Sequence, residues 1–154
     1  MYKALVLPLA IAALSGCAQM EKMMGIEVKS DLKACPTKIA IGEVPSCGKV
    51  WKLASGSAEL KTDGDLEAQV KGLVLNDPST GTSNGTPDGV DGVAAAVVCT
   101  GKVVAQTDVV PLSKEGYASV KAKVSVPSDC KSPVIVLRER YQGKIGGWLA
   151  ATSF

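Results

Sequence analysis

Residues 117–126 read YASVKAKVSV, and apolar and polar side chains alternate along most of this segment. The small apolar residues would share one face of an extended chain, namely Ala118, Val120, Ala122, Val124 and Val126. Lys121, Lys123 and Ser125 would lie on the opposite face. Alternation with a period of two residues is typical of a strand with one face in a core and the other in water. The segment therefore predicts a half-buried β-strand.

Two hairpins are predicted upstream of this strand. Residues 57–61 and 66–71 both alternate, and they flank residues 62–65, which contain the pair Asp63-Gly64. An Asp-Gly pair favours a tight turn because glycine accepts a positive φ. Residues 93–99 form an apolar run, which is typical of a strand covered on both faces or of a short buried helix. The pair Thr100-Gly101 then predicts a turn into residues 102–107.

Two further strands are predicted downstream. Residues 134–137 and 145–152 are apolar, and Gln142-Gly143-Lys144 predicts the turn that joins them. The domain contains no long amphipathic pattern with helical spacing. About seven short strands predict an all-β fold, an antiparallel, immunoglobulin-like β-sandwich that occupies residues 49–154.

The composition excludes several classes of function. The 154 residues include no histidine, which excludes Ser-His and Cys-His catalysis and His-ligated zinc. A formal net charge of +2 is too small for a phosphate-binding surface, so we expect no nucleic-acid partner. No nucleophile motif is present, and acid/base pairs such as Glu59 with Glu67, or Glu115 with Glu139, need a geometry that sequence does not supply. We expect the protein not to be an enzyme, with a hydrolase as the minor alternative.

The first residues are organised as an export signal. Lys3 gives a positive start, and residues 4–14 form an apolar run that only Pro8 interrupts. As a helix this run would extend about 17 Å, well short of the roughly 30 Å of hydrocarbon in a bilayer, so it is too short to span one. Its length suits the core of a signal peptide, which we expect to comprise residues 1–16.

The end of this run, Leu14-Ser15-Gly16-Cys17, resembles the lipobox of bacterial lipoproteins. In that family the cysteine thiol receives a diacylglycerol, cleavage occurs just before the cysteine, and the new amino terminus is usually acylated. The resemblance implies that Cys17 carries a covalent lipid, including palmitate, which holds the protein at a membrane. The alternative is an ordinary secretory signal with a coincidental cysteine.

The residue after the lipobox cysteine bears on the location in the cell envelope. In the lipoprotein family an aspartate there typically retains the protein at the inner membrane, whereas this chain has Ala18. The resemblance therefore implies the outer membrane where the source cell has two membranes. Residues 17–34 are largely polar and predict a lipidated spacer. The alternative is a short amphipathic helix that lies on lipid or on a partner, since Met20, Met23, Met24 and Ile26 have partly helical spacing.

The other four cysteines agree with an oxidising compartment. Cys35, Cys47, Cys99 and Cys130 permit three pairings, and we favour the local one, Cys35–Cys47 with Cys99–Cys130. The first pair would close a loop over residues 35–48, ahead of the main domain. The spacing lacks the C-x-x-C pattern of zinc sites and of redox motifs, so we expect neither.

The segment 76–92, NDPSTGTSNGTPDGVDG, consists mostly of turn-forming residues. Long irregular segments in compact domains are often functional or disordered. Oxygen ligands for calcium are available here, namely Asp77, Asn84, Asp88 and Asp91. Their spacing matches no calcium loop that we can name, so a solvated connection is favoured and a calcium-stabilised adhesive module is the alternative. No other cofactor is expected.

A second resemblance covers about residues 51–152. Its strings are VKGLVL at 70–75, VVC at 97–99, VPSDCKSPV at 126–134 and GWLA at 147–150. They resemble a group of small exported bacterial proteins without an assigned function. In that group two cysteines recur and a tryptophan lies near the end, which implies a Cys99–Cys130 bridge but no activity.

The few aromatic residues bear on the choice of partner. Trp51 and Trp148 would form a glycan-binding platform only if both were exposed, and we expect both in the core instead. The sequence therefore favours a membrane-anchored, non-enzymatic binding or structural module. It would present its β-sandwich to an unknown envelope protein or glycan.

Overall fold

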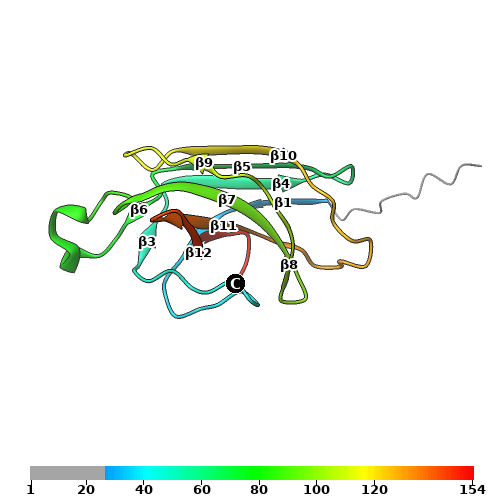
Figure 1. Ribbon diagram of the computed structural model, residues 1–154, viewed down its shortest axis with the longest axis horizontal. Coiled ribbons are helices and arrows are strands. Elements are labelled where there is room, and N and C mark those ends of the chain that lie inside the picture. Colours follow the sequence, from blue (N-terminus) through cyan, green and yellow to red (C-terminus); the bar gives the residue numbers. More distant parts are fainter. Residues whose placement is uncertain (1–26) are drawn as a thin grey trace, which may run out of the picture.

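A computed structural model describes residues 27–154 of the chain (Figure 1). The predicted signal peptide, Cys17 and residues 18–26 lie outside this range. The described residues form strands and one short 3₁₀ helix, η1 (Pro78–Ser83). The strands are β1 (Val28–Asp31), β2 (Lys33–Ala34), β3 (Trp51–Lys52), β4 (Ser55–Leu60), β5 (Asp65–Lys71), β6 (Val74–Leu75), β7 (Val90–Cys99), β8 (Lys102–Gln106), β9 (Val110–Pro111), β10 (Ala118–Lys123), β11 (Val134–Tyr141) and β12 (Lys144–Ala151).

The strands form a sandwich of antiparallel sheets. One sheet has the order β1-β4-β5-β10, which we call the four-stranded sheet. The other has the order β2-β12-β11-β7-β8, with β9 also paired to β7, and β3 pairs with β6 in a small separate ribbon. This arrangement confirms the predicted all-β sandwich. Four strands have only two residues each, β2, β3, β6 and β9, which is too short to show a period by themselves.

Both predicted hairpins are present, one formed by β4 and β5 and the other by β7 and β8. In β5, Leu66, Ala68 and Val70 are buried, and β5 follows β4 through a turn in which Gly64 has a φ of 93°. Every residue from Gly92 to Cys99 in β7 is buried, and β7 lies between β11 on one side and β8 and β9 on the other. The segment is therefore a strand covered on both faces, and not the short buried helix that its composition also allowed.

One hydrophobic core joins the sheets. Side chains from the four-stranded sheet, such as Leu60 and Leu66, belong to the same buried cluster as Ile135 and Leu137 of β11. Trp148 is fully buried in it. Burial of apolar surface on this scale is the main force that holds the two sheets together.

The predicted domain boundaries need correction at the amino-terminal side. Residues 28–34 were expected to belong to the spacer, but β1 pairs with β4 in one sheet and β2 pairs with β12 in the other. In this segment only Val28, Leu32 and Ala34 are apolar, which is too few to show a strand pattern. The sandwich therefore begins at Val28 rather than at residue 49.

The segment 35–48 is also part of the domain rather than a loop ahead of it. The backbone N–H of Cys35 donates to the carbonyl of Leu149 at 2.9 Å, and the N–H of Trp148 donates to the carbonyl of Pro45 at 3.0 Å. The indole Nε1 of Trp148 donates to the carbonyl of Ile39 at 2.7 Å. These bonds hold the segment against β12.

The two ends of the sandwich differ. The described chain starts at the end that carries the β4–β5 turn, because Val28 pairs with Leu60 at the last position of β4. At the opposite end lie residues 48–51, residues 76–90, the turn before β10 and the turn between β11 and β12, which we call the loop end (Figure 1). Within residues 27–154 no helix is long and apolar enough to cross a membrane.

Candidate functional site

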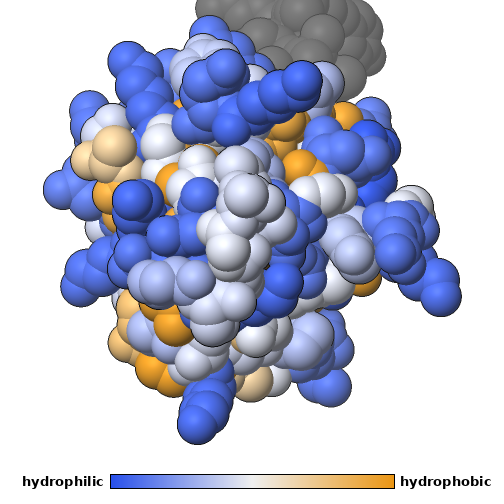
Figure 2. Space-filling view, turned by 90° about the vertical axis from the view of Figure 1, so that its left-hand side faces the viewer, coloured by the Kyte–Doolittle hydropathy of each residue, from blue (hydrophilic) through white to orange (hydrophobic). Residues whose placement is uncertain are grey.

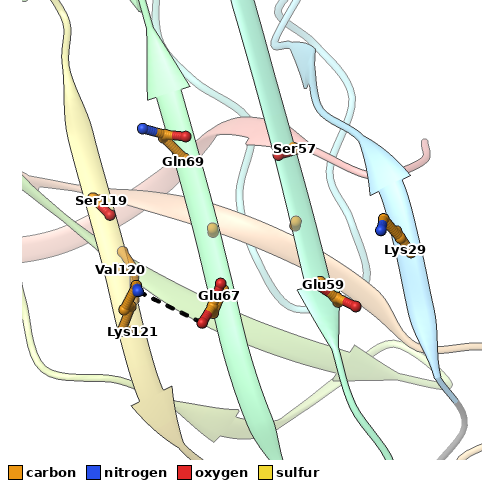
Figure 3. Close-up of a pocket in the computed structure, with 10 residues that line it drawn as sticks. Lys29, Ser57, Glu59, Glu67, Gln69, Ser119, Val120 and Lys121 are labelled. Carbon is orange, nitrogen blue, oxygen red and sulfur yellow. Dashed lines mark ion pairs between the residues drawn. The ribbon is translucent and has the colours of Figure 1, made fainter.

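Polar side chains cover the solvent-facing side of the four-stranded sheet, where they line a shallow hollow of about 390 Å³ (Figure 3). Strand register places charged residues in one row across the sheet, Lys29, Glu59, Glu67 and Lys121. The adjacent row consists of Ser57, Gln69 and Ser119. The hollow can therefore offer hydrogen-bond donors and acceptors from all four strands.

The structure brings together one of the acid pairs that the sequence raised. Glu59 and Glu67 are direct cross-strand partners, and Lys121 Nζ lies 3.8 Å from Glu67 Oε1. The two carboxylates repel each other across the strands, and the ion pair of Glu67 with Lys121 offsets part of this repulsion. In contrast, Glu115 lies exposed in the turn before β10, whereas Glu139 lies half-buried on β11.

A second hollow, of about 230 Å³, lies at the loop end, and we call it the loop-end pocket. Its lining comes from four separate parts of the chain, and comprises Gly48, Lys49, Trp51, Leu75, Asp88, Val90, Glu139 and Tyr141. Apolar, aromatic and charged side chains thus converge on one small space. Such a mixture is typical of ligand pockets, in which apolar walls carry a few placed polar groups.

The charged groups of the loop-end pocket are held in defined positions. Lys49 Nζ donates to Asp88 Oδ2 at 2.5 Å. This hydrogen bond raises the pKa of the Lys49 ammonium and lowers the pKa of the Asp88 carboxyl, so the pair is ionised at neutral pH. Partial burial raises the pKa of the Glu139 carboxyl. A Cβ atom at Gly146 would lie 2.9 Å from Glu139 Oε1, so this carboxylate rests directly against the backbone of β12.

Aromatic rings supply two sides of the pocket. Trp51 is buried, with 6% of its surface exposed, as the sequence predicted. Tyr141 is 45% exposed, and its ring lies against Gly89, where a Cβ atom would be 3.2 Å from Tyr141 Cε2. The lining thus includes one buried aromatic ring and one accessible aromatic ring.

A third hollow, of about 390 Å³, adjoins the loop-end pocket. It is formed by residues 86–91 and 112–114, and the two hollows share Asp88 and Val90. Figure 2 looks onto this end of the molecule, where hydrophilic residues dominate and apolar residues show in small separate groups. The loop end therefore combines two hollows with a mainly polar surface.

The calcium candidates Asp77 and Asn84 lie close together at the base of η1. Asp77 Oδ1 accepts hydrogen bonds from the backbone N–H and the hydroxyl of Ser79, at 3.1 and 2.6 Å. Asn84 Oδ1 accepts from the backbone N–H of Asp77 at 2.9 Å. These oxygens fix the turn that begins the 3₁₀ helix.

The other two calcium candidates have partners elsewhere. Asp88 forms the ion pair with Lys49, and Asp91 Oδ1 accepts from Arg140 Nε at 2.8 Å. In the described part of the chain no three His, Cys, Asp or Glu side chains are grouped so as to hold a metal ion. The structure therefore does not bring the four candidates together as one ligand set.

The four cysteines after Cys17 form the two favoured disulfides. Cys35 is bonded to Cys47 with the Cα atoms 6.2 Å apart, and Cys99 is bonded to Cys130 with the Cα atoms 5.5 Å apart. Both separations are ordinary for disulfides. The first bridge closes the segment that packs on β12, and the second joins the end of β7 to the segment before β11.

Sequence reasoning did not identify the loop-end pocket as a set. Lys49 and Asp88 are separated by 39 positions, and Glu139 and Tyr141 come from a third region of the chain. One signal was available, since Tyr141 is an aromatic residue directly before the predicted Gln142-Gly143 turn and so lies at a strand end. Nothing in the sequence pairs that strand end with residue 49.

Comparison of the chain with protein-family models, with curated proteins and with solved structures gave no match.

Proposed function

We propose that this protein is a lipid-anchored, non-enzymatic binding module of the cell envelope. Cys17 attaches it to a membrane, the outer one where the cell has two, and the loop end binds an envelope protein or a glycan. The lipobox-like Leu14-Ser15-Gly16-Cys17 supports the anchor. The two hollows at the loop end support the binding role.

One observation carries the proposal, namely that β1, the first strand of the described residues, begins at the end opposite the loop end (Figure 1). A module tethered through the residues before Val28 would hold this end of the sandwich toward its attachment point. The loop end would then face away from the membrane and would be accessible to a partner. Tethering also confines the module near envelope partners, which raises its effective concentration there.

Two features favour binding over catalysis. The chain contains no histidine, and the neighbouring carboxylates Glu59 and Glu67 lie on an open sheet face. Acid/base catalysis by a pair of carboxyl groups is favoured when their environments separate the two pKa values and the site excludes water. The open hollow over this pair instead suits reversible polar contacts.

The anchor is tested by metabolic labelling of the full chain with palmitate, followed by membrane fractionation. The wild-type chain should carry label and sediment with membranes, whereas Cys17→Ser should lose the label and leave the membrane fraction. Met20→Ser, which alters the tether outside the four-residue motif, is the matched control and should behave as the wild type. In a cell with two membranes, Ala18→Asp should keep the label and move the protein to the inner membrane. Unchanged fractionation of Cys17→Ser would refute the anchor.

A further inference from the structure

We propose that the loop-end pocket binds one neutral pyranose ring of a glycan. This inference rests on the proposed function, because it names the partner class of the loop end.

The size of the pocket suits a single ring. Its volume of about 230 Å³ lies below the roughly 300–1,000 Å³ typical of pockets for drug-sized ligands. A single sugar ring is of suitable size, whereas an extended peptide or a nucleotide is not. Because Tyr141 and Lys49 at the edge of the pocket are both about half exposed, neighbouring rings of a glycan can continue outward into solvent.

The charges favour a neutral ligand. An anion would meet the carboxylates of Asp88 and Glu139, and a cation would meet the ammonium of Lys49. Lys49 and Asp88 already neutralise each other, so neither group is left to pair with a charged ligand. A hydroxyl group both donates and accepts hydrogen bonds, so a polyhydroxyl ligand can satisfy the ammonium and the carboxylates together.

The polar groups are preorganised. The ion pair fixes Lys49 against Asp88, and Glu139 rests against the backbone at Gly146. Groups already held in place lose little conformational entropy when a ligand binds. A sugar ring that enters would therefore meet the carboxylate of Glu139 on β11, the ammonium of Lys49 and the carboxylate of Asp88.

The apolar part of the pocket matches the other side of a sugar. A pyranose has a face of C–H groups, which packs on aromatic rings. Tyr141 contacts Gly89 and still has 45% of its surface exposed, so part of its ring is open to a ligand. Trp51 and Leu75, which are both buried, add further apolar surface to the lining. By contrast, the residues that line the hollow on the four-stranded sheet include no aromatic side chain.

The test measures sugar binding by the full mature protein in detergent micelles, using isothermal titration with tetrasaccharides of glucose, mannose, galactose and N-acetylglucosamine. At least one should bind at millimolar concentration or below. Tyr141→Ala should weaken that binding about tenfold through loss of the stacking surface, and Glu139→Gln should weaken it through loss of a charged acceptor. Tyr117→Ala is the matched control, because Tyr117 is also 45% exposed but does not line the pocket.

Several outcomes would overturn the inference. These are no binding of any of the four sugars, equal weakening by Tyr141→Ala and Tyr117→Ala, or tighter binding of a lysine-rich or aspartate-rich peptide that Tyr141→Ala abolishes. The unfolding midpoint of each variant shows whether it is folded. Sugar binding in micelles does not depend on palmitate labelling in cells, so an anchored protein that binds no sugar would refute this inference alone.

Discussion

Replacement of Trp148 tests the core of the sandwich most directly. The side chain is fully buried, its Nε1 donates to the carbonyl of Ile39, and its ring centroid lies 4.7 Å from that of Phe154. Removal of a buried tryptophan side chain typically costs about 3–5 kcal/mol. At about 4 °C per kcal/mol for a domain of this size, Trp148→Ala should lower the Tm by roughly 10–20 °C.

A milder variant separates the hydrogen bond from the packing. Trp148→Phe keeps most of the ring but removes the Nε1 donor, and should cost about 1–2 kcal/mol. Urea unfolding followed by circular dichroism gives the free energy of unfolding for both variants. Tyr117→Ala, at an exposed position, should change it by only about 0.5 kcal/mol. A loss below about 1 kcal/mol for Trp148→Ala would show that this ring does not join the segment 35–48 to the core.

Three further predictions concern the disulfides, the pH dependence and calcium. By the loop-entropy model, replacing Cys35–Cys47 with alanines should lower the free energy of unfolding in urea by about 3 kcal/mol, and replacing Cys99–Cys130 should lower it by about 4 kcal/mol. The second loss is larger because that bridge closes the longer loop. The reverse order of the two losses would contradict the model. The pKa of Glu139 is raised in the folded state. Between the ordinary value of 4.5 and the raised value, the folded protein therefore binds more protons than the unfolded chain. This group thus makes the free energy of unfolding fall as the pH rises through that window. Glu139→Gln should remove that contribution. The free energy of unfolding of the variant minus that of the wild type should therefore rise as the pH increases across the window. A constant difference would contradict a raised pKa of Glu139 in the folded state. Millimolar calcium or EDTA should leave the Tm unchanged, because the candidate oxygens already have separate partners; a rise with calcium would show a site that forms only on binding.

The strands that were predicted well have one face in the core and one in water. Alternation in 66–71 and 118–123 is visible because each inward residue is apolar and each outward residue is polar. β1 was missed because it has four residues and only Val28 among them is apolar. Its position depends on pairing with β4, a long-range contact that a local pattern does not contain.

The candidate site depends even more on long-range contacts, which a local sequence pattern does not contain. The buried state of Trp51 was predictable from the scarcity of large residues in the sequence. The meeting of Lys49 with Asp88 was not, because it depends on how two irregular segments are folded over the end of the sandwich. The calcium candidates are close in sequence, yet the fold gives Asp88 and Asp91 different basic partners.

The direction in which β1 enters the sandwich has a mechanical consequence. The strands of the four-stranded sheet run between the end where the described chain starts and the loop end (Figure 1). A pull between residue 27 and the loop end would therefore act along β1 and shear it against β4. In shear, all the hydrogen bonds between two strands resist the force together, whereas a pull across the strands would break them one after another. Tension from a tether before Val28 would thus load the β1–β4 pair along its strands.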